Sequence, residues 1–225
     1  MWCVPAIDDA YVDRMEDVLE VYARPHDESE PVVCLDERPV VLREHARPPA
    51  PMRPRRVKRV DYEYVRRGTA NIFCIVEPKT GRRLTHATDR RTSRRFAQAL
   101  AKVSRRYARA RTIHLIVDNL STHSRKPCID TYGPQDGDAL WRRFTVHYTP
   151  KHASWLNAAE LEASLVAREC LGRQRIPDLP VLTEGVGAWS RRADRERRPI
   201  HWNFTVADAR RVFRYDGITT PRARH

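Results

Sequence analysis

The sequence predicts a mixed α/β fold, with one sheet flanked by helices. Short apolar runs rich in β-branched residues alternate along the chain with longer segments whose apolar residues recur at helical spacing. Residues 113–117 form a mostly apolar run that ends abruptly in polar residues, which is typical of a strand buried on both faces. Residues 71–77 and 82–87 flank a Pro-Lys-Thr-Gly turn and predict a hairpin.

The N-terminal segment predicts an acidic amphipathic helix that starts at Asp8 or Asp9 and reaches Tyr22. Residues 1–36 hold ten acids and two bases. The apolar positions recur at helical spacing and are Val12, Met15, Val18, Leu19 and Tyr22. A polar linker, residues 25–31, follows the helix. We therefore expect residues 1–31 to form a unit of their own, whose acidic face could serve as a partner surface.

The first strand, residues 32–35, ends in Asp36 and Glu37. The next section, residues 43–67, contains nine Lys/Arg, four prolines and few apolar residues. Such a composition predicts an extended basic loop, not a part of the core. The hairpin of residues 71–87 comes next.

The second half of the chain alternates helices and strands. A helix is expected from Thr92 or Ser93 to about residue 108, followed by the strand 113–117. Residues 124–143 contain two prolines and two glycines and predict a loop with a short helix. Residues 144–148 predict another strand.

Three helices are expected after the last strand. The first covers residues 157–170, and the second starts at Asp178 and runs toward Trp189, weakened by two glycines. Thr205 and Asp208 have the spacing of a capping box that opens the third, which ends near residue 213. We expect the main domain to span residues 32–215 and to be followed by a basic tail, residues 216–225.

The composition favours a nucleic-acid partner. Among 225 residues there are 42 Lys+Arg and 29 Asp+Glu, a formal net charge of +13 with a pI near 10.1. Such a charge favours binding to polyanions, although it is also compatible with a solvated basic surface.

Five cysteines without a CxxC pair argue against a disulfide framework and a zinc knuckle. No apolar run is long enough for a membrane span and no signal pattern is present, so we expect a cytoplasmic protein without membrane contact.

Three acids are candidates for a catalytic site. Asp36 and Asp118 each end an apolar strand, where a carboxylate is either a helix cap or part of a site. Glu160 lies at the edge of an apolar stripe on the helix 157–170, whereas Glu162 and Glu169 are expected to point away from it toward water. The stripe consists of Leu156, Ala159, Ala163, Ala167 and Cys170. From spacing alone, Glu160 is as compatible with an ordinary rim residue as with a site residue.

Three converging carboxylates repel one another unless a cation lies between them. Mg²⁺, or Mn²⁺ in its place, prefers such oxygen ligands and leaves room for water and phosphate. Two ions about 3.5–4 Å apart can activate an attacking oxygen and stabilise a leaving oxygen in phosphodiester chemistry. The basic remainder of the chain, with about +21, would hold the DNA backbone.

Four blocks of the sequence resemble a known family. They are VVCLDE, DYEYVRRGTANIFCIVEPKTG, IHLIVDNLSTH and FTVHYTPKHASWLNAAELEASLVARECLGRQRIPDL. They resemble the catalytic region of bacterial insertion-sequence transposases, more narrowly the six-thirty family, which is related to the mariner elements. The similarity runs from about Trp2 to Phe213, and the HYTPKHASWLN block is its most specific part. It implies a ribonuclease H-like fold and a DDE metal triad of Asp36, Asp118 and Glu160.

The resemblance also implies a reaction and its partners. Metal-activated water would cut a phosphodiester at the transposon end, and the freed 3′-hydroxyl would attack target DNA. Two ends must be brought together, so a homodimer or higher assembly on DNA, associated with the nucleoid, is expected by analogy. Relatives carry N-terminal helix-turn-helix domains, and this sequence starts at the linker that follows them. The alternative is therefore a truncated, non-catalytic DNA-binding remnant or a partner of an intact transposase; a stand-alone nuclease is a third reading.

Supporting residues surround these acids. Asn119 and His123 could position Asp118 or a phosphate, or could cap the next helix. Lys151 and His152 are candidate phosphate contacts, and Asn157 precedes Glu160 by one helical turn. The densest basic cluster is expected to bind DNA in a salt-dependent, sequence-tolerant manner and consists of Arg53, Arg55, Arg56, Lys58 and Arg59.

Overall fold

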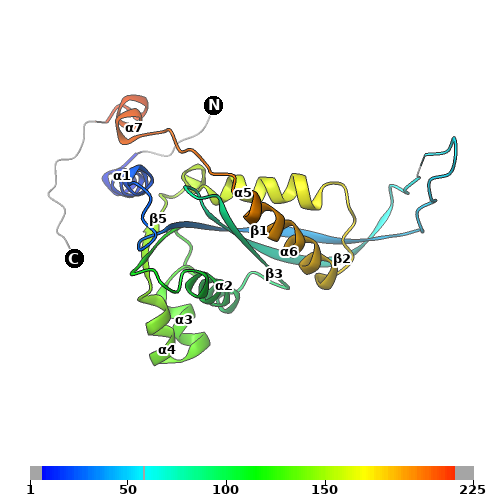
Figure 1. The fold of residues 1–225 in the computed structure, drawn as a ribbon, viewed down its shortest axis with the longest axis horizontal. Helices are drawn as coiled ribbons and strands as arrows, with labels where there is room; N and C mark the ends of the chain where they lie inside the picture. Colours follow the sequence, from blue (N-terminus) through cyan, green and yellow to red (C-terminus); the bar gives the residue numbers. More distant parts are fainter. Residues whose placement is uncertain (1–6, 58, 216–225) are drawn as a thin grey trace.

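A five-stranded mixed sheet forms the centre of the structure, a computed structural model that describes residues 7–57 and 59–215. The strand order is β3-β2-β1-β4-β5, with β1, β2 and β3 antiparallel and β1, β4 and β5 parallel (Figure 1). This confirms the predicted mixed sheet. The strands are β1 (Val32–His45), β2 (Tyr64–Glu77), β3 (Arg82–Thr88), β4 (Ile113–Val117) and β5 (Phe144–Tyr148). Lys58, residues 1–6 and the expected basic tail lie outside the described residues.

Helices cover both faces of the sheet (Figure 1). One face carries α2 (Ser93–Arg106), with α3 (Arg125–Tyr132) and α4 (Pro134–Trp141) beside it. The other face carries α1 (Asp9–Ala23), α5 (Ala159–Leu165), α6 (Leu179–Glu196) and α7 (Val206–Phe213). All five residues of β4 are buried, as expected for a strand covered on both sides.

The helix ends follow the predicted capping signals. Asp8 accepts a hydrogen bond from the Tyr11 amide at the start of α1. Thr205 and Asp208 form the expected capping box of α7, with hydrogen bonds in both directions. Within the described ranges, no helix is both long and apolar enough to cross a membrane.

The prediction of a basic loop over residues 43–67 is wrong at both ends. β1 continues to His45, and β2 begins at Tyr64, so the two strands pair far beyond the body of the sheet. We call residues 43–67 the arm; it projects to the right in Figure 1. These strand ends could not be predicted from the sequence, because a two-stranded ribbon outside the core has no buried face. Its residues therefore do not need to alternate between apolar and polar.

Three other segments differ from the prediction. Residues 124–143 form two short helices, α3 and α4, instead of a loop with one. They fit together because Gly137 passes so close to α3 that a Cβ there would lie 2.4 Å from the carbonyl oxygen of Cys128.

α6 runs past both of its glycines to Glu196, since its apolar stripe is buried against the sheet. The expected helix 157–170 divides into α5 and a π-helical turn (Val166–Leu171), and a 3-10 turn (Ser154–Leu156) precedes it.

Candidate functional site

Strand pairing brings Asp36 and Asp118 to the same level of the sheet. β1 and β4 are parallel, and Cys34 is paired with Ile116. Each acid follows its paired residue by two positions, so both lie at the level of the carboxyl end of β4. α5 covers this end of the two strands, because Cys34 and Ile116 pack in one cluster with Ala159.

Asn157 connects β1 to the helix that carries Glu160. Its Nδ2 donates to the carbonyl oxygen of Leu35 at 2.9 Å, one residue before Asp36. Its Oδ1 accepts from the amide of Ala159 at 3.1 Å, and its carbonyl oxygen accepts from the amide of Glu160 at 3.0 Å. The buried amide side chain of Asn157 therefore places the first turn of α5 beside the two strand-end acids.

Tyr22 of α1 fixes the same turn and was not identified from the sequence. Its hydroxyl donates to the carbonyl oxygen of Leu156 at 2.9 Å and accepts from the amide of Ala158 at 3.0 Å. In the sequence Tyr22 was one of the apolar positions of a helix, and nothing there indicated a role for its hydroxyl group. The N-terminal helix is thus part of the framework of the site.

The electrostatics of Asp36 show that the acids are close to one another. Burial raises the pKa of Asp36 to about 7, against a backbone hydrogen bond from Glu37. The carboxylates of Glu160, Glu37 and Asp118 contribute to this rise. The structure therefore brings Asp36 within electrostatic reach of Asp118, Glu160 and Glu37.

His123 bridges two of these acids from the α2 side. Its Nε2 lies 3.0 Å from Oε1 of Glu37, and its Nδ1 lies 2.5 Å from Oδ1 of Asp118. Burial lowers the pKa of His123, but these two carboxylates outweigh burial and raise it to about 9. The ring stacks on Phe96 with centroids 4.4 Å apart. Glu37 was missed as a site residue, although its place beside Asp36 in the sequence was a signal.

The oxygens at this rim fit a divalent cation. The contact between His123 and Oδ1 of Asp118 lacks hydrogen-bond geometry, so this buried oxygen has no hydrogen-bond partner among the described residues. The same is true of Oε2 of Glu37. Ligand atoms of Glu37, Asp118 and His123 all lie within 4.8 Å of one another. Mg²⁺ and Mn²⁺ prefer oxygen ligands, so the carboxylates of Glu37 and Asp118 are the candidate ligands within this group.

A cavity of about 510 Å³ is lined in part by Asn119, the residue that follows Asp118. It brings together Asn119, Lys151 and His152, three residues that the sequence suggested as supporting or DNA-binding, with Arg14 of α1. Its remaining lining residues are Asp8, Ala10, Tyr11 and Pro150. The acid of this set, Asp8, already caps α1, so the cavity offers mainly positive and neutral donors to a ligand.

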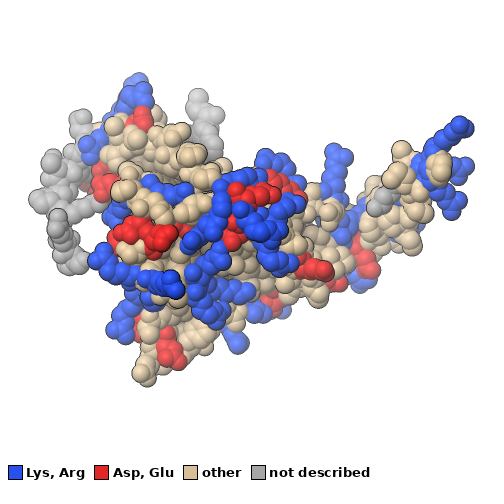
Figure 2. Space-filling view, in the orientation of Figure 1, with Lys and Arg blue, Asp and Glu red and all other residues tan. Residues whose placement is uncertain are grey.

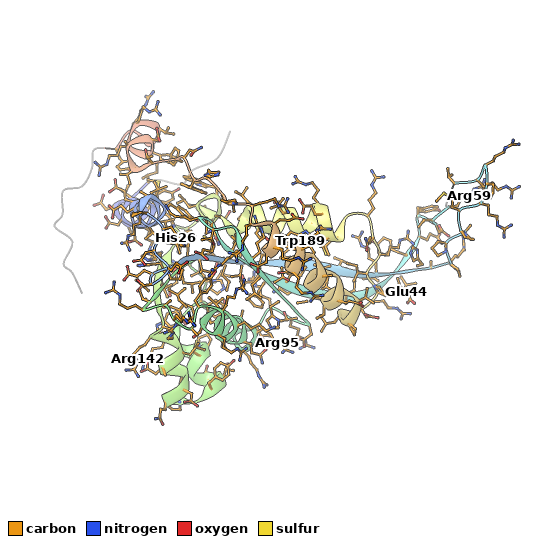
Figure 3. All side chains as sticks on the ribbon, viewed as in Figure 1. His26, Glu44, Arg59, Arg95, Arg142 and Trp189 are labelled. Atoms are coloured by element: carbon orange, nitrogen blue, oxygen red, sulfur yellow. The ribbon has the colours of Figure 1, made fainter. Side chains whose placement is uncertain are left out.

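The basic cluster of the arm lies far from the acids. Arg53, Arg55, Arg56 and Arg59 are exposed near the tip of the arm, where Arg53 pairs with Arg56 across a tight turn. Arg59 lies at the far end of the arm in Figure 3, and Figure 2 shows Lys and Arg side chains gathered there. The structure therefore separates this cluster from the cavity that holds Lys151 and His152.

The expectation that Glu162 faces water is wrong. Its side chain is fully buried and forms an ion pair with Arg83 of β3 at 2.9 Å. Glu169 is half-buried and pairs with Arg198. Glu160, by contrast, is exposed at the rim. The helical stripe could not reveal Glu162 because its counter-charge comes from a strand 79 residues away in the sequence.

Comparisons with known proteins agree with this architecture. A family profile described as DDE superfamily endonuclease matches residues 31–183. Among solved structures, the Mos1 mariner paired-end complex with Mn is 15% identical, with a TM-score of 0.55 over 87% of this chain and 59% of that chain. The Mos1 strand transfer complex is 14% identical, with a TM-score of 0.54 over 85% of this chain and 57% of that chain. Among curated proteins, no sequence matches.

The similarity to the solved structures confirms the predicted ribonuclease H-like fold. This chain spans about three fifths of the length of those chains. The profile match covers the candidate acids, from the strand that carries Asp36 to the helix that carries Glu160.

Proposed function

Because this chain belongs to the DDE superfamily of endonucleases, we propose that it is the catalytic domain of an insertion-sequence transposase. It would cut a DNA strand at a transposon end and join the new 3′-hydroxyl to target DNA. The observation that carries the proposal is that Asp36 of β1 and Asp118 after β4 lie at the same level of two paired strands, with Glu160 of α5 near enough to raise the pKa of Asp36. We place the catalytic domain at residues 32–215 and the N-terminal helix and linker at residues 1–31.

In this proposal Asp36, Asp118 and Glu160 hold two divalent cations, Mg²⁺ or Mn²⁺. Bound there, the cations would supply Lewis-acid activation of the attacking oxygen and charge stabilisation of the leaving oxygen. His123 hydrogen-bonds to Glu37 and forms an ion-pair contact with Asp118 that keeps this acid oriented, and Asn157 keeps α5 beside β1. The orientation of the carboxylates would thus be set by neighbouring groups before DNA binds.

DNA would lie across the rim and continue toward the arm. Lys151 and His152, with Asn119 beside them, line the cavity next to Asp118 and are placed to contact phosphates. The arginines of the arm, Arg53, Arg55, Arg56 and Arg59, would hold the backbone at a distance from the acids, and we include Lys58 in this set. A protein that works on DNA in this way would be found with the nucleoid.

Assembly on DNA is a further part of the proposal. The similar solved structures include paired-end complexes of Mos1. We infer that two copies of this domain act together when two DNA ends are joined. Helix-turn-helix domains would have to supply the recognition of end sequences, since the proposed DNA contacts of this domain are mainly to phosphates.

The test uses a nicked duplex with a free 3′-hydroxyl, incubated with the protein and Mg²⁺ or Mn²⁺. We expect cleaved and joined strands, whose formation is abolished by Asp118→Asn and by EDTA. Asp130→Asn, which changes an exposed acid paired with Lys126, is the matched control and should react as the wild type does.

The other possible outcomes of this assay distinguish the enzyme from a DNA binder and from a nuclease. A wild-type protein that shifts DNA but yields no products contradicts the enzyme and supports the alternative, a non-catalytic DNA binder or partner of an intact transposase. Cleavage without joined products supports a nuclease. Unchanged activity of Asp118→Asn would contradict the assigned site.

A further inference from the structure

Arg38 has an unused hydrogen-bond donor beside the candidate acids. It follows Asp36 on β1 by two residues, so both side chains lie on the face that α5 and the π-helical turn cover. Arg38 is half-buried, and its Nε is buried without a hydrogen-bond partner among the described residues. A buried charged donor without an acceptor is costly, which indicates that an acceptor joins it in the working complex.

A groove of about 360 Å³ adjoins this side chain. One wall is β1 and the other is the π-helical turn with the chain that follows it. The lining consists of Arg38, Pro39, Val40, Val41, Arg43, Ala167, Leu171, Gly172, Gln174 and Ile176. The two charged residues of the lining are both arginines, and no Asp or Glu is among them. The groove therefore suits an anion.

The walls of the groove are fixed before any ligand arrives. The backbone amide of Arg43 donates to the carbonyl oxygen of Ile176 at 2.7 Å, which ties β1 to the opposite wall. The guanidinium of Arg43 lies over the ring of Tyr64, 4.8 Å from its centroid. In contrast to Arg83 and Arg198, whose guanidinium groups pair with Glu162 and Glu169, Arg38 forms no such ion pair within the described residues.

We propose that Arg38 and this groove bind a backbone phosphate of the DNA strand that is cut, next to the scissile phosphate; the proposal rests on the function proposed above. Two residues along a strand span about 6.6 Å, comparable to the spacing of neighbouring phosphates in one DNA strand. The planar guanidinium fork of Arg38 matches phosphate oxygens. Asp36 would thus face the reacting phosphate while Arg38 holds its neighbour, and the groove leads the strand toward the arm.

The experiment measures binding of a short nicked duplex by fluorescence anisotropy, without divalent cations. The variants are Arg38→Ala and Arg38→Lys, with Arg173→Ala as the control, since Arg173 is an exposed arginine next to the groove but outside its lining. A series of duplexes carries one neutral methylphosphonate at each successive position around the nick. Thermal unfolding of every variant shows whether the fold is intact.

We expect Arg38→Ala to weaken binding about tenfold, Arg38→Lys to weaken it less, and Arg173→Ala to leave it unchanged. At one position beside the nick, methylphosphonate should weaken binding of the wild type by the same factor and that of Arg38→Ala not at all. A purely structural role of Arg38 cannot produce this position-specific loss of sensitivity.

The proposal is overturned if Arg38→Ala and the wild type respond equally to every methylphosphonate, or if the wild type does not bind the duplex. The reaction with Mg²⁺ or Mn²⁺ is followed separately. A wild type that binds but does not cut contradicts the proposed enzyme, while the binding series still decides whether the groove holds a phosphate.

Discussion

At the scale of single residues, Arg83 and Glu162 form the most deeply buried ion pair described in this protein. Their side chains are 1% and 0% exposed, and Arg83 also donates to the carbonyl oxygens of Gly81 and Arg198. Burial raises the pKa of Glu162, against the effect of Arg83. The pair joins β3 to α5, the helix that also carries Glu160.

We expect Arg83→Met to lower the free energy of unfolding by about 3–5 kcal/mol, because it leaves the carboxylate of Glu162 buried without its counter-charge. Urea unfolding measures the loss. Arg95→Met, which breaks a partly exposed pair with Asp89, is the control and should leave the unfolding midpoint nearly unchanged.

Replacing both partners tests the reason for this loss. Arg83→Met combined with Glu162→Leu should recover most of the lost stability, since no unpaired charge then remains in the core. If the double variant is no more stable than Arg83→Met alone, packing around Arg83, and not its charge, accounts for the effect.

At the scale of elements, α1 is held to the sheet by a chain of polar side chains. Arg24 lies 3.1 Å from Nε2 of His114, His114 Nδ1 lies 2.9 Å from His147 Nε2, and His147 Nδ1 lies 2.6 Å from Asp17. Arg24 has only donors, so Nε2 of His114 must accept, and each ring then donates from Nδ1 to the next group. This arrangement requires His114 to be neutral.

We expect His114 to stabilise the folded protein less as the pH falls below about 6.5, the pKa of an unfolded histidine. Burial lowers the pKa of His114, and His147 and Arg24 lower it further, against the effect of Glu30. Below that pH His114 binds a proton in the unfolded chain but stays neutral in the folded chain, so acidification favours unfolding. Urea unfolding between pH 7.5 and 5.5 measures this contribution.

Other groups titrate in the same range, so the variant comparison is decisive. His86, whose pKa burial lowers to about 4, acts in the same direction as His114, whereas Asp36, whose pKa is raised to about 7, acts in the opposite direction. His114→Gln should reduce the loss of stability on acidification relative to the wild type. An identical pH dependence of the two proteins would show that His114 makes no contribution.

The arm is the second element with a testable role. Its strands pair only with each other beyond the sheet, and its tip carries exposed arginines. Reversing the charge of Arg53, Arg55 and Arg56 to Glu should weaken DNA binding and reduce the slope of log K against log salt by about 0.9 for each lost phosphate contact. Anisotropy titrations at several salt concentrations measure both quantities.

A matched reversal on the α2 side provides the control, at the exposed residues Arg94, Arg105 and Arg109. It changes the net charge by the same amount. If the two triple variants lose the same affinity, net charge explains the binding and the arm has no special role.

At the scale of the whole molecule, the charge of the chain and its placement predict salt-dependent, sequence-tolerant binding. The net charge is +13, and the proposed phosphate contacts extend from the cavity beside Asp118 to the tip of the arm. With about 6–10 phosphate contacts, affinity for a duplex should fall by roughly 10³–10⁵ between 50 and 200 mM salt. Two duplexes of unrelated sequence should bind equally; a large preference for one would indicate base readout within this domain.

The sequence by itself determined the fold class, most of the elements and the candidate acids. The strands around the turn at residues 78–81, the strand before Asp118 and the capped helices α1, α2 and α7 are visible as local patterns. Local periodicity reports which face of a segment is buried, so these elements could be predicted. The sequence blocks that contain Asp36, Asp118 and Glu160 also indicated the family that the profile confirms.

Only the tertiary structure decided which distant groups meet. Four features of the structure have no local pattern in the sequence. They are the strand pairing of the arm, the burial of Glu162 against Arg83, the contact of His123 with Glu37, and the Nε of Arg38 without a hydrogen-bond partner in the described part of the chain. The physical reason is that burial and charge pairing depend on partners contributed by other elements. A chain read segment by segment shows which residues can do chemistry, and the fold determines which of them share one site.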